Sequence, residues 1–174
     1  MALSRAAWIA AGLGARLLMV AVLAMTVQLT LANHTRRSYE DDFYKLQSYS
    51  YTVAAAVIGM AGSALQVPVA VYLLCRSKRM TPSALVLDVS MYADVVVTVL
   101  LASGVGAGFG ATIDALRYVR HVTWWDGDAT KQDLIRYYDK AFLPVVFLLV
   151  GMVLSMAATV VSARLRARTA NDDV

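Results

Sequence analysis

The sequence predicts an all-α membrane protein, a bundle of four transmembrane helices with both termini in the cytosol. Three observations lead to this fold class: the composition, four long apolar runs, and the placement of the basic residues. Of the 174 residues, 59% are hydrophobic and only 16% are charged, whereas charged residues make up about 25% of a typical soluble domain. A soluble protein of this length could not bury so much apolar surface, so lipid must surround much of the chain.

Four apolar runs mark the expected helices. They cover about residues 6–32, 52–74, 84–113 and 141–163 of a single membrane domain, 1–174. Each run is long enough to cross a hydrocarbon core of about 30 Å. The first run also has features of a signal peptide, with Arg5 before it and Thr30-Leu31-Ala32 at its end. Arg16 interrupts that run and its apolar length exceeds a usual signal core, so we favour a retained helix.

The segments between the runs indicate the orientation. The segment at about 75–83 contains three basic residues and no acidic one, and the tail at 164–174 opens with three arginines. In contrast, the loops at about 33–51 and 114–140 balance basic residues with acidic ones. Because cytosolic segments carry the excess of Lys and Arg, we expect the termini and the segment at 75–83 in the cytosol and the other two loops outside.

The loop at 114–140 is expected to be partly helical. Thr130-Lys131-Gln132-Asp133 has roughly the spacing of a capping box. Leu134, Tyr137, Tyr138 and Ala141 then recur at helical spacing toward the last apolar run. A helix that begins before residue 141 is therefore expected at this end of the loop.

Charged side chains within the apolar runs are candidate functional residues, since each costs roughly 2.5–3.5 kcal/mol at membrane depth. The first and third helices both leave the cytosol, so Arg16 matches the depth of Asp94 if the first helix begins near Ala6, and that of Asp88 if it begins near Gly12. Asp88 and Asp94 are turned about 120° apart, so one arginine is not expected to hold both. We favour an intramembrane Arg16–Asp94 pair over a snorkelling arginine, with Asp88 as a secondary acid, because opposite charges at one depth relieve each other's desolvation.

Four glycines near the end of the third run form a candidate helix-packing face. Gly104 with Gly108, and Gly106 with Gly110, are small residues four apart, a spacing that lets two membrane helices approach closely. The partner helix can belong to the same bundle or to another copy in an oligomer, and the spacing does not distinguish the two.

Cys75 and Asn33 are candidate modification sites. Cys75 lies next to Arg76 at the expected cytosolic end of the second helix, a position that suits S-palmitoylation or an unmodified thiol equally well. Asn33-His34-Thr35 is a glycosylation sequon. It directly abuts the membrane, so we expect it to be bare or poorly used.

The sequence does not indicate an enzyme. It contains a single cysteine and two histidines far apart, so neither a disulfide within the chain nor a metal site is expected. No nucleophile with a histidine base and no phosphate-binding loop is apparent, so we expect no catalytic residue and no cofactor. The net charge of +4 does not indicate nucleic acid, because many basic residues flank apolar runs, where they orient a membrane protein.

The chain resembles the plant Casparian strip membrane domain-like (CASP-like) proteins, which are related to MARVEL-type four-helix membrane proteins. The matching motifs, within about residues 14–163, are Arg16-Leu17-Leu18, Tyr51, Val53-Ala54-Ala55-Ala56, Ser63-Ala64-Leu65-Gln66, Asp94 and Leu100-Leu101-Ala102-Ser103-Gly104. On this match Asp94 corresponds to the family aspartate. The stretch at 38–43 and the absence of cysteines from the last outer loop depart from the barrier-forming members, so a role in building the Casparian strip itself is not implied.

The resemblance implies a non-enzymatic, multi-pass scaffold of the plasma membrane, surrounded by lipid, that forms homo-oligomers or hetero-oligomers with related proteins. Such scaffolds assemble membrane domains and recruit partners, including secreted wall-modifying enzymes. The alternative is a small oligomeric transporter or channel that uses Arg16, Asp88 and Asp94 along a polar path. The second and fourth apolar runs contain no acidic or basic residue, so such a path would need several copies, and this favours the scaffold.

The orientation can be tested with terminal tags. Protease added outside sealed cells should leave tags at both termini intact, because the arginine excess assigns both ends to the cytosol. A tag inserted in the loop at 114–140 should be removed by the same treatment. Loss of either terminal tag from intact cells would refute the orientation.

Overall fold

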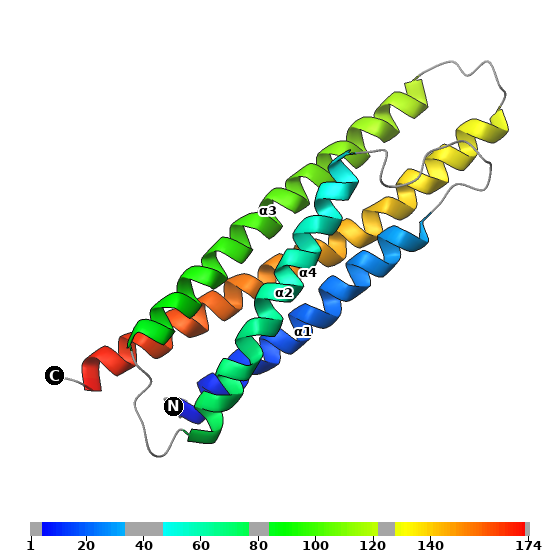
Figure 1. Ribbon diagram of the computed structural model, residues 1–174. Coiled ribbons are helices and arrows are strands. Elements are labelled where there is room, and N and C mark those ends of the chain that lie inside the picture. Colours follow the sequence, from blue (N-terminus) through cyan, green and yellow to red (C-terminus); the bar gives the residue numbers. More distant parts are fainter. Residues whose placement is uncertain (1–4, 34–46, 77–83, 122–127, 173–174) are drawn as a thin grey trace.

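The computed structural model of the protein describes residues 5–33, 47–76, 84–121 and 128–172 and folds them into four long helices (Figure 1). They are α1 (Arg5–Ala32), α2 (Gln47–Arg76), α3 (Ala84–His121) and α4 (Asp128–Asp172). Each helix is long and apolar enough to cross a membrane, and the described residues contain no strand. The predicted all-α, four-helix membrane fold is therefore confirmed, whereas the side of the membrane on which each terminus lies stays a prediction.

The four helices form an up-and-down bundle in which successive helices run antiparallel (Figure 1). Extensive contacts join α1 to α2, α2 to α3, α3 to α4 and α4 back to α1, so α1 and α3 lie on one diagonal and α2 and α4 on the other. A side chain that joins α1 to α3 must therefore cross the interior of the bundle.

The main apolar core lies inside the bundle and receives side chains from every helix. Its buried members are Met19, Leu23, Ala56, Val97, Leu101, Val105 and Leu148. The outward positions are apolar as well, and the side chains of Leu65 and Val99 are 75% and 63% exposed on the isolated chain. Helices that are apolar on all sides are typical of membrane spans, where lipid covers the outer faces.

Three helices extend beyond the apolar runs at the end of the bundle that carries the α3–α4 connection (Figure 1). α2 begins at Gln47, α3 ends at His121 and α4 begins at Asp128, whereas the runs place these ends near 52, 113 and 141. A second buried cluster holds the extensions together: Tyr49, Leu116, Val119, Leu134, Tyr137, Tyr138 and Ala141. The apolar runs mark only the part of each helix that is apolar on all sides. Beyond a run, the helix continues where one apolar face still packs against a neighbouring helix.

The four glycines of α3 divide into an inward pair and an outward pair. A Cβ atom at Gly104 would lie 2.9 Å from the Cβ of Ala55, and one at Gly108 would lie 2.9 Å from a methyl group of Val145. Nothing lies within 4 Å of the same position at Gly106 or Gly110. Two residues along a helix turn the side-chain direction by about 200°, so the inward pair packs against α2 and α4 and the outward pair faces the surroundings.

Candidate functional site

Arg16 of α1 and Asp94 of α3 meet in the interior of the bundle. Arg16 Nη2 lies 2.7 Å from Asp94 Oδ2, and each side chain is only 8% exposed. Because α1 and α3 are diagonal to each other, this contact crosses the interior and ties together two helices that otherwise barely touch. At this length the contact is a charge-assisted hydrogen bond, which is roughly twice as strong as one between neutral groups.

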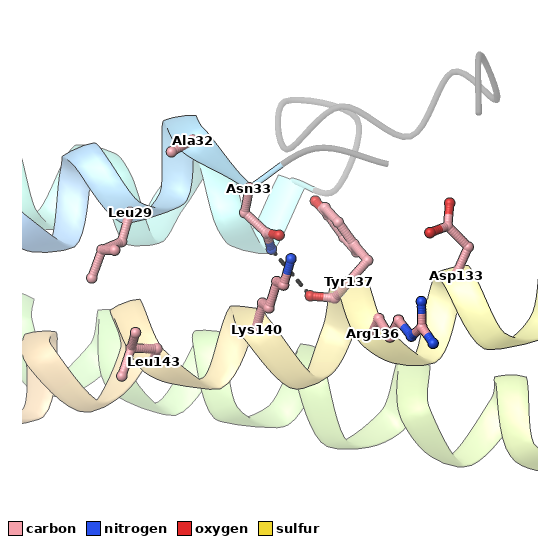
Figure 2. Close-up of a pocket in the computed structure, with 8 residues that line it drawn as sticks. All are labelled: Leu29, Ala32, Asn33, Asp133, Arg136, Tyr137, Lys140 and Leu143. Carbon is pink, nitrogen blue, oxygen red and sulfur yellow. Dashed lines mark hydrogen bonds between the residues drawn. The ribbon is translucent and has the colours of Figure 1, made fainter. Parts of the chain in front are cut away.

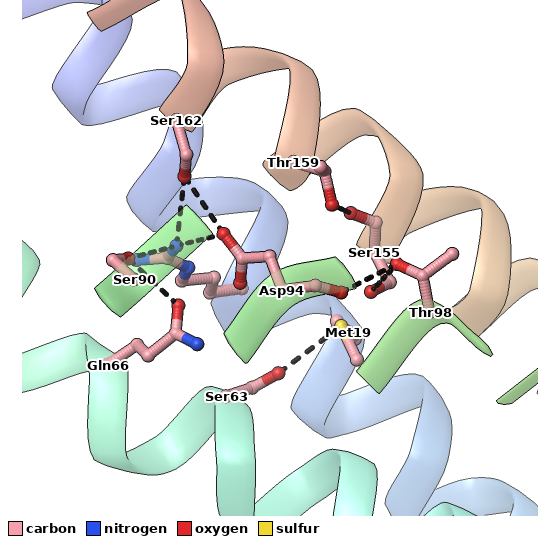
Figure 3. A network of polar contacts seen from close by, with 10 residues as sticks. Met19, Ser63, Gln66, Ser90, Asp94, Thr98, Ser155, Thr159 and Ser162 are labelled. Atoms are coloured by element: carbon pink, nitrogen blue, oxygen red, sulfur yellow. Dashed lines mark hydrogen bonds and ion pairs between the residues drawn. The ribbon is translucent and has the colours of Figure 1, made fainter. Parts of the chain in front are cut away.

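Polar groups of the other two helices and of α3 surround the pair (Figure 3). Ser162 of α4 donates to Asp94 Oδ2 at 2.9 Å, and its oxygen accepts from Arg16 Nη2 at 3.3 Å. Ser90 of α3 accepts from Arg16 Nη2 at 3.3 Å and donates to Gln66 Oε1 of α2, also at 3.3 Å. These five residues, which we call the charge junction, join all four helices.

Further hydroxyl contacts continue one turn along α3 from the charge junction (Figure 3). Thr98 donates to the carbonyl oxygen of Asp94 at 2.8 Å, and its Oγ1 lies 2.7 Å from Ser155 Oγ of α4. Since the single hydroxyl proton of Thr98 goes to the carbonyl, Ser155 is the donor between the two hydroxyls. The hydroxyls next to the junction are thus engaged with one another and with helix backbone.

The geometry of the charge junction suits a structural lock. Burial removes water from both charges, so each is stabilised mainly by the other and by the surrounding hydroxyls. Only one guanidinium nitrogen of Arg16 contacts Asp94, and Arg16 Nε has no hydrogen-bond partner in the described part of the chain. The ion pair is therefore monodentate, with one nitrogen of Arg16 and one oxygen of Asp94 in contact.

Comparison with known proteins identifies the family. Residues 5–150 match the model of the Casparian strip membrane protein domain. The chain belongs to this family. The CASP-like protein 4D1 of Ricinus communis is 27% identical over 121 residues, which are 70% of this chain and 67% of that protein. No solved structure matches the chain significantly.

The family predicted from the sequence is confirmed by this match, and the matched range contains most of the charge junction. Arg16, Gln66, Ser90 and Asp94 lie within residues 5–150. Ser162 lies beyond them, in the second half of α4. Arg16, Asp94 and two of their polar neighbours thus lie within the matched CASP domain. The remaining member of the charge junction, Ser162, comes from the part of α4 that follows the matched range.

The other candidate residues lie apart from the charge junction. Asp88 is half-buried on α3 and is not among the hydrogen-bond partners of Arg16, which are Ser90, Asp94 and Ser162. The position of Cys75 is helical, and its side chain lies outside the described part of the structure.

Asn33 forms a contact at the other end of the membrane span. Its Nδ2 donates to the carbonyl oxygen of Tyr137 at 3.1 Å, which joins the end of α1 to α4. A glycan would be attached to this same nitrogen, and attachment would disturb the contact. The other two residues of the sequon lie outside the described residues.

Ser90 and Ser162 belong to the charge junction but have no distinctive signal in the sequence. Ser90 precedes Asp94 by four residues and therefore shares its helix face, so its role could have been predicted once Asp94 was selected. The contribution of Ser162 depends on the rotation of α4 about its axis, and the apolar pattern does not reveal that rotation because both faces are apolar. Gln66 is a polar residue in an apolar run, and only the packing of α2 identifies its partner.

Removal of one charge should destabilise the CASP domain strongly. Asp94→Asn or Arg16→Gln leaves the opposite charge buried and should lower the free energy of unfolding by roughly 3–5 kcal/mol. Arg16→Lys should lower it less, because an ammonium group can supply the single donor that Asp94 uses. Thermal unfolding of the purified variants in detergent would rank their losses of stability.

Two further variants serve as controls for this experiment. Asp88→Asn removes an acid of the same helix outside the charge junction and should have a milder effect. Exchange of the two charges in Arg16→Asp/Asp94→Arg should recover part of the lost stability. If both single variants melt like the parent protein, the pair is incidental and Arg16 is better described as a snorkelling residue.

Proposed function

We propose that this protein is a non-enzymatic scaffold of the plasma membrane. In this proposal it forms homo-oligomers, or hetero-oligomers with related CASP-domain proteins, and organises partner proteins around them, including secreted enzymes that modify the cell wall. Membership of the family supports a multi-pass membrane protein. The scaffold role, the plasma-membrane location and the partners are what the proposal adds.

The outward face of α3 is the observation that carries this proposal. Gly106 and Gly110 are exposed there, and a Cβ atom at either position would have no neighbour within 4 Å. They lie in one stripe with Val99 and Ile113, which are 63% and 45% exposed. Two glycines one turn apart leave a shallow depression where the backbone of another helix can come close, and such contact drives association in lipid, where the hydrophobic effect does not.

The charge junction favours a closed bundle rather than a transport path. Arg16 and Asp94 bond to each other and to serines and are shielded from the surroundings. The main apolar core continues from there along the interior, and Leu23, Leu101 and Leu148 in it are fully buried. A transporter instead needs ionisable groups that meet water or substrate during its cycle.

The oligomer can be tested with glycine substitutions. Gly106→Leu should weaken lateral contacts between copies, because it fills the depression on α3 without a clash inside the bundle. Gly14→Leu on α1 is the matched control, since Gly14 is also exposed and has nothing within 4 Å of a Cβ position. In live membranes, recovery after photobleaching should be slow for the parent protein and for Gly14→Leu and faster for Gly106→Leu. Equal recovery of all three would contradict the proposed face.

A flux measurement on reconstituted protein can separate the scaffold from the transporter. Purified parent protein in liposomes should pass no ions or small solutes above the level of empty vesicles. Robust flux that disappears in Asp94→Asn would contradict the scaffold and support a transport path through the charge junction.

A further inference from the structure

A pocket of about 680 Å³ opens between the last turn of α1 and the first part of α4 (Figure 2). Leu29, Ala32 and Asn33 line it from the α1 side. The hydrogen bond from Asn33 to the Tyr137 carbonyl oxygen joins its α1 and α4 sides. The pocket lies at the end of the bundle opposite the charge junction and has no residue in common with it.

The lining changes from apolar to charged along α4. Leu29 and Leu143 approach each other at one side of the pocket, and Lys140 and Arg136 follow toward the beginning of α4 (Figure 2). The three α4 residues share a helix face, because they are four and three positions apart. Arg136 and Leu143 are separated by about 10 Å along the helix axis, a distance comparable to the passage from the hydrocarbon core into the headgroup layer.

The two basic side chains of the pocket are not engaged by the described part of the chain. Arg136 and Lys140 are exposed, and neither has a hydrogen bond or ion pair with another described residue. Lys131 at the same end of the bundle differs, since it donates to the carbonyl oxygen of Arg120 at 3.1 Å. Asp133 also lines the pocket, so two cations stand against one carboxylate and the balance favours an anion.

We propose that this pocket binds an anionic lipid, with its phosphate against Arg136 and Lys140 and an acyl chain along Leu29 and Leu143. A soluble anion would pair with the cations but would leave the apolar side of the pocket unfilled. A zwitterionic lipid would fill the apolar side but would bring its own cationic group toward the basic residues. An anionic lipid matches both parts, and the proposal does not depend on oligomerisation.

Native mass spectrometry can test this site on the full-length protein. The purified chain would be equilibrated in mixed micelles with equal amounts of phosphatidylglycerol and phosphatidylcholine of the same acyl composition, and the retained lipids would be counted. The parent protein should retain one phosphatidylglycerol in clear preference. Arg136→Gln/Lys140→Gln should reduce that preference roughly tenfold, because each basic side chain near an anionic headgroup contributes to binding.

Matched controls distinguish this pocket from a general effect of charge. Arg117→Gln/Arg120→Gln removes the same two charges from exposed positions of α3 at the same end of the bundle and should leave the preference unchanged. An excess of glycerol phosphate, which carries the anion without acyl chains, should not displace the lipid. The proposal is overturned if the parent protein shows no preference, if both double variants lose it equally, or if glycerol phosphate displaces the lipid.

Discussion

The contact between Arg16 and Asp94 is the interaction on which the bundle depends. A single charge at membrane depth is costly, so the two residues must meet inside the protein, and the diagonal placement of their helices directs that contact through the interior. The remaining helices each supply one polar group to the same place, Gln66 from α2 and Ser162 from α4. Because the junction forms completely only when all four helices are in register, it selects one packing among the many that apolar surfaces alone would allow.

α3 has one face that packs inside the bundle and an opposite face that is open to the surroundings. One face carries Asp94 and the inward glycines Gly104 and Gly108, which bring α2 and α4 close to its backbone. The opposite face carries Gly106 and Gly110, where an added Cβ atom would have no neighbour within 4 Å. With the interior locked, the open face is the part of the helix left to other molecules in the membrane, and this is the physical basis of the proposed scaffold.

The sequence predicts the fold well because hydropathy and charge report directly on the membrane. The apolar runs locate all four helices, but they stop short of the helix ends, since Tyr49, Leu116 and Tyr137 stabilise the extensions by packing rather than by entering lipid. Depth matches Arg16 to Asp94 or to Asp88 according to where α1 begins, and the sequence does not define that start closely. α1 begins at Arg5, close to the start that matches Asp94, and the structure pairs Arg16 with Asp94. The glycine spacing is the same on both faces of α3 and does not by itself identify the inward pair. The position of Asp94 does, since Gly108 follows it by 14 residues and therefore shares its helix face.

The most direct test of the role of the charge junction is a double-mutant cycle on Arg16 and Asp94. The free energy of unfolding would be determined in the same bicelles for the parent protein, Arg16→Gln, Asp94→Asn and the double variant. If the pair locks the bundle, the double variant will be more stable than either single variant, because it leaves no buried charge unpaired. If the losses of the two single variants simply add in the double variant, the two residues do not interact and the central role of the charge junction is contradicted.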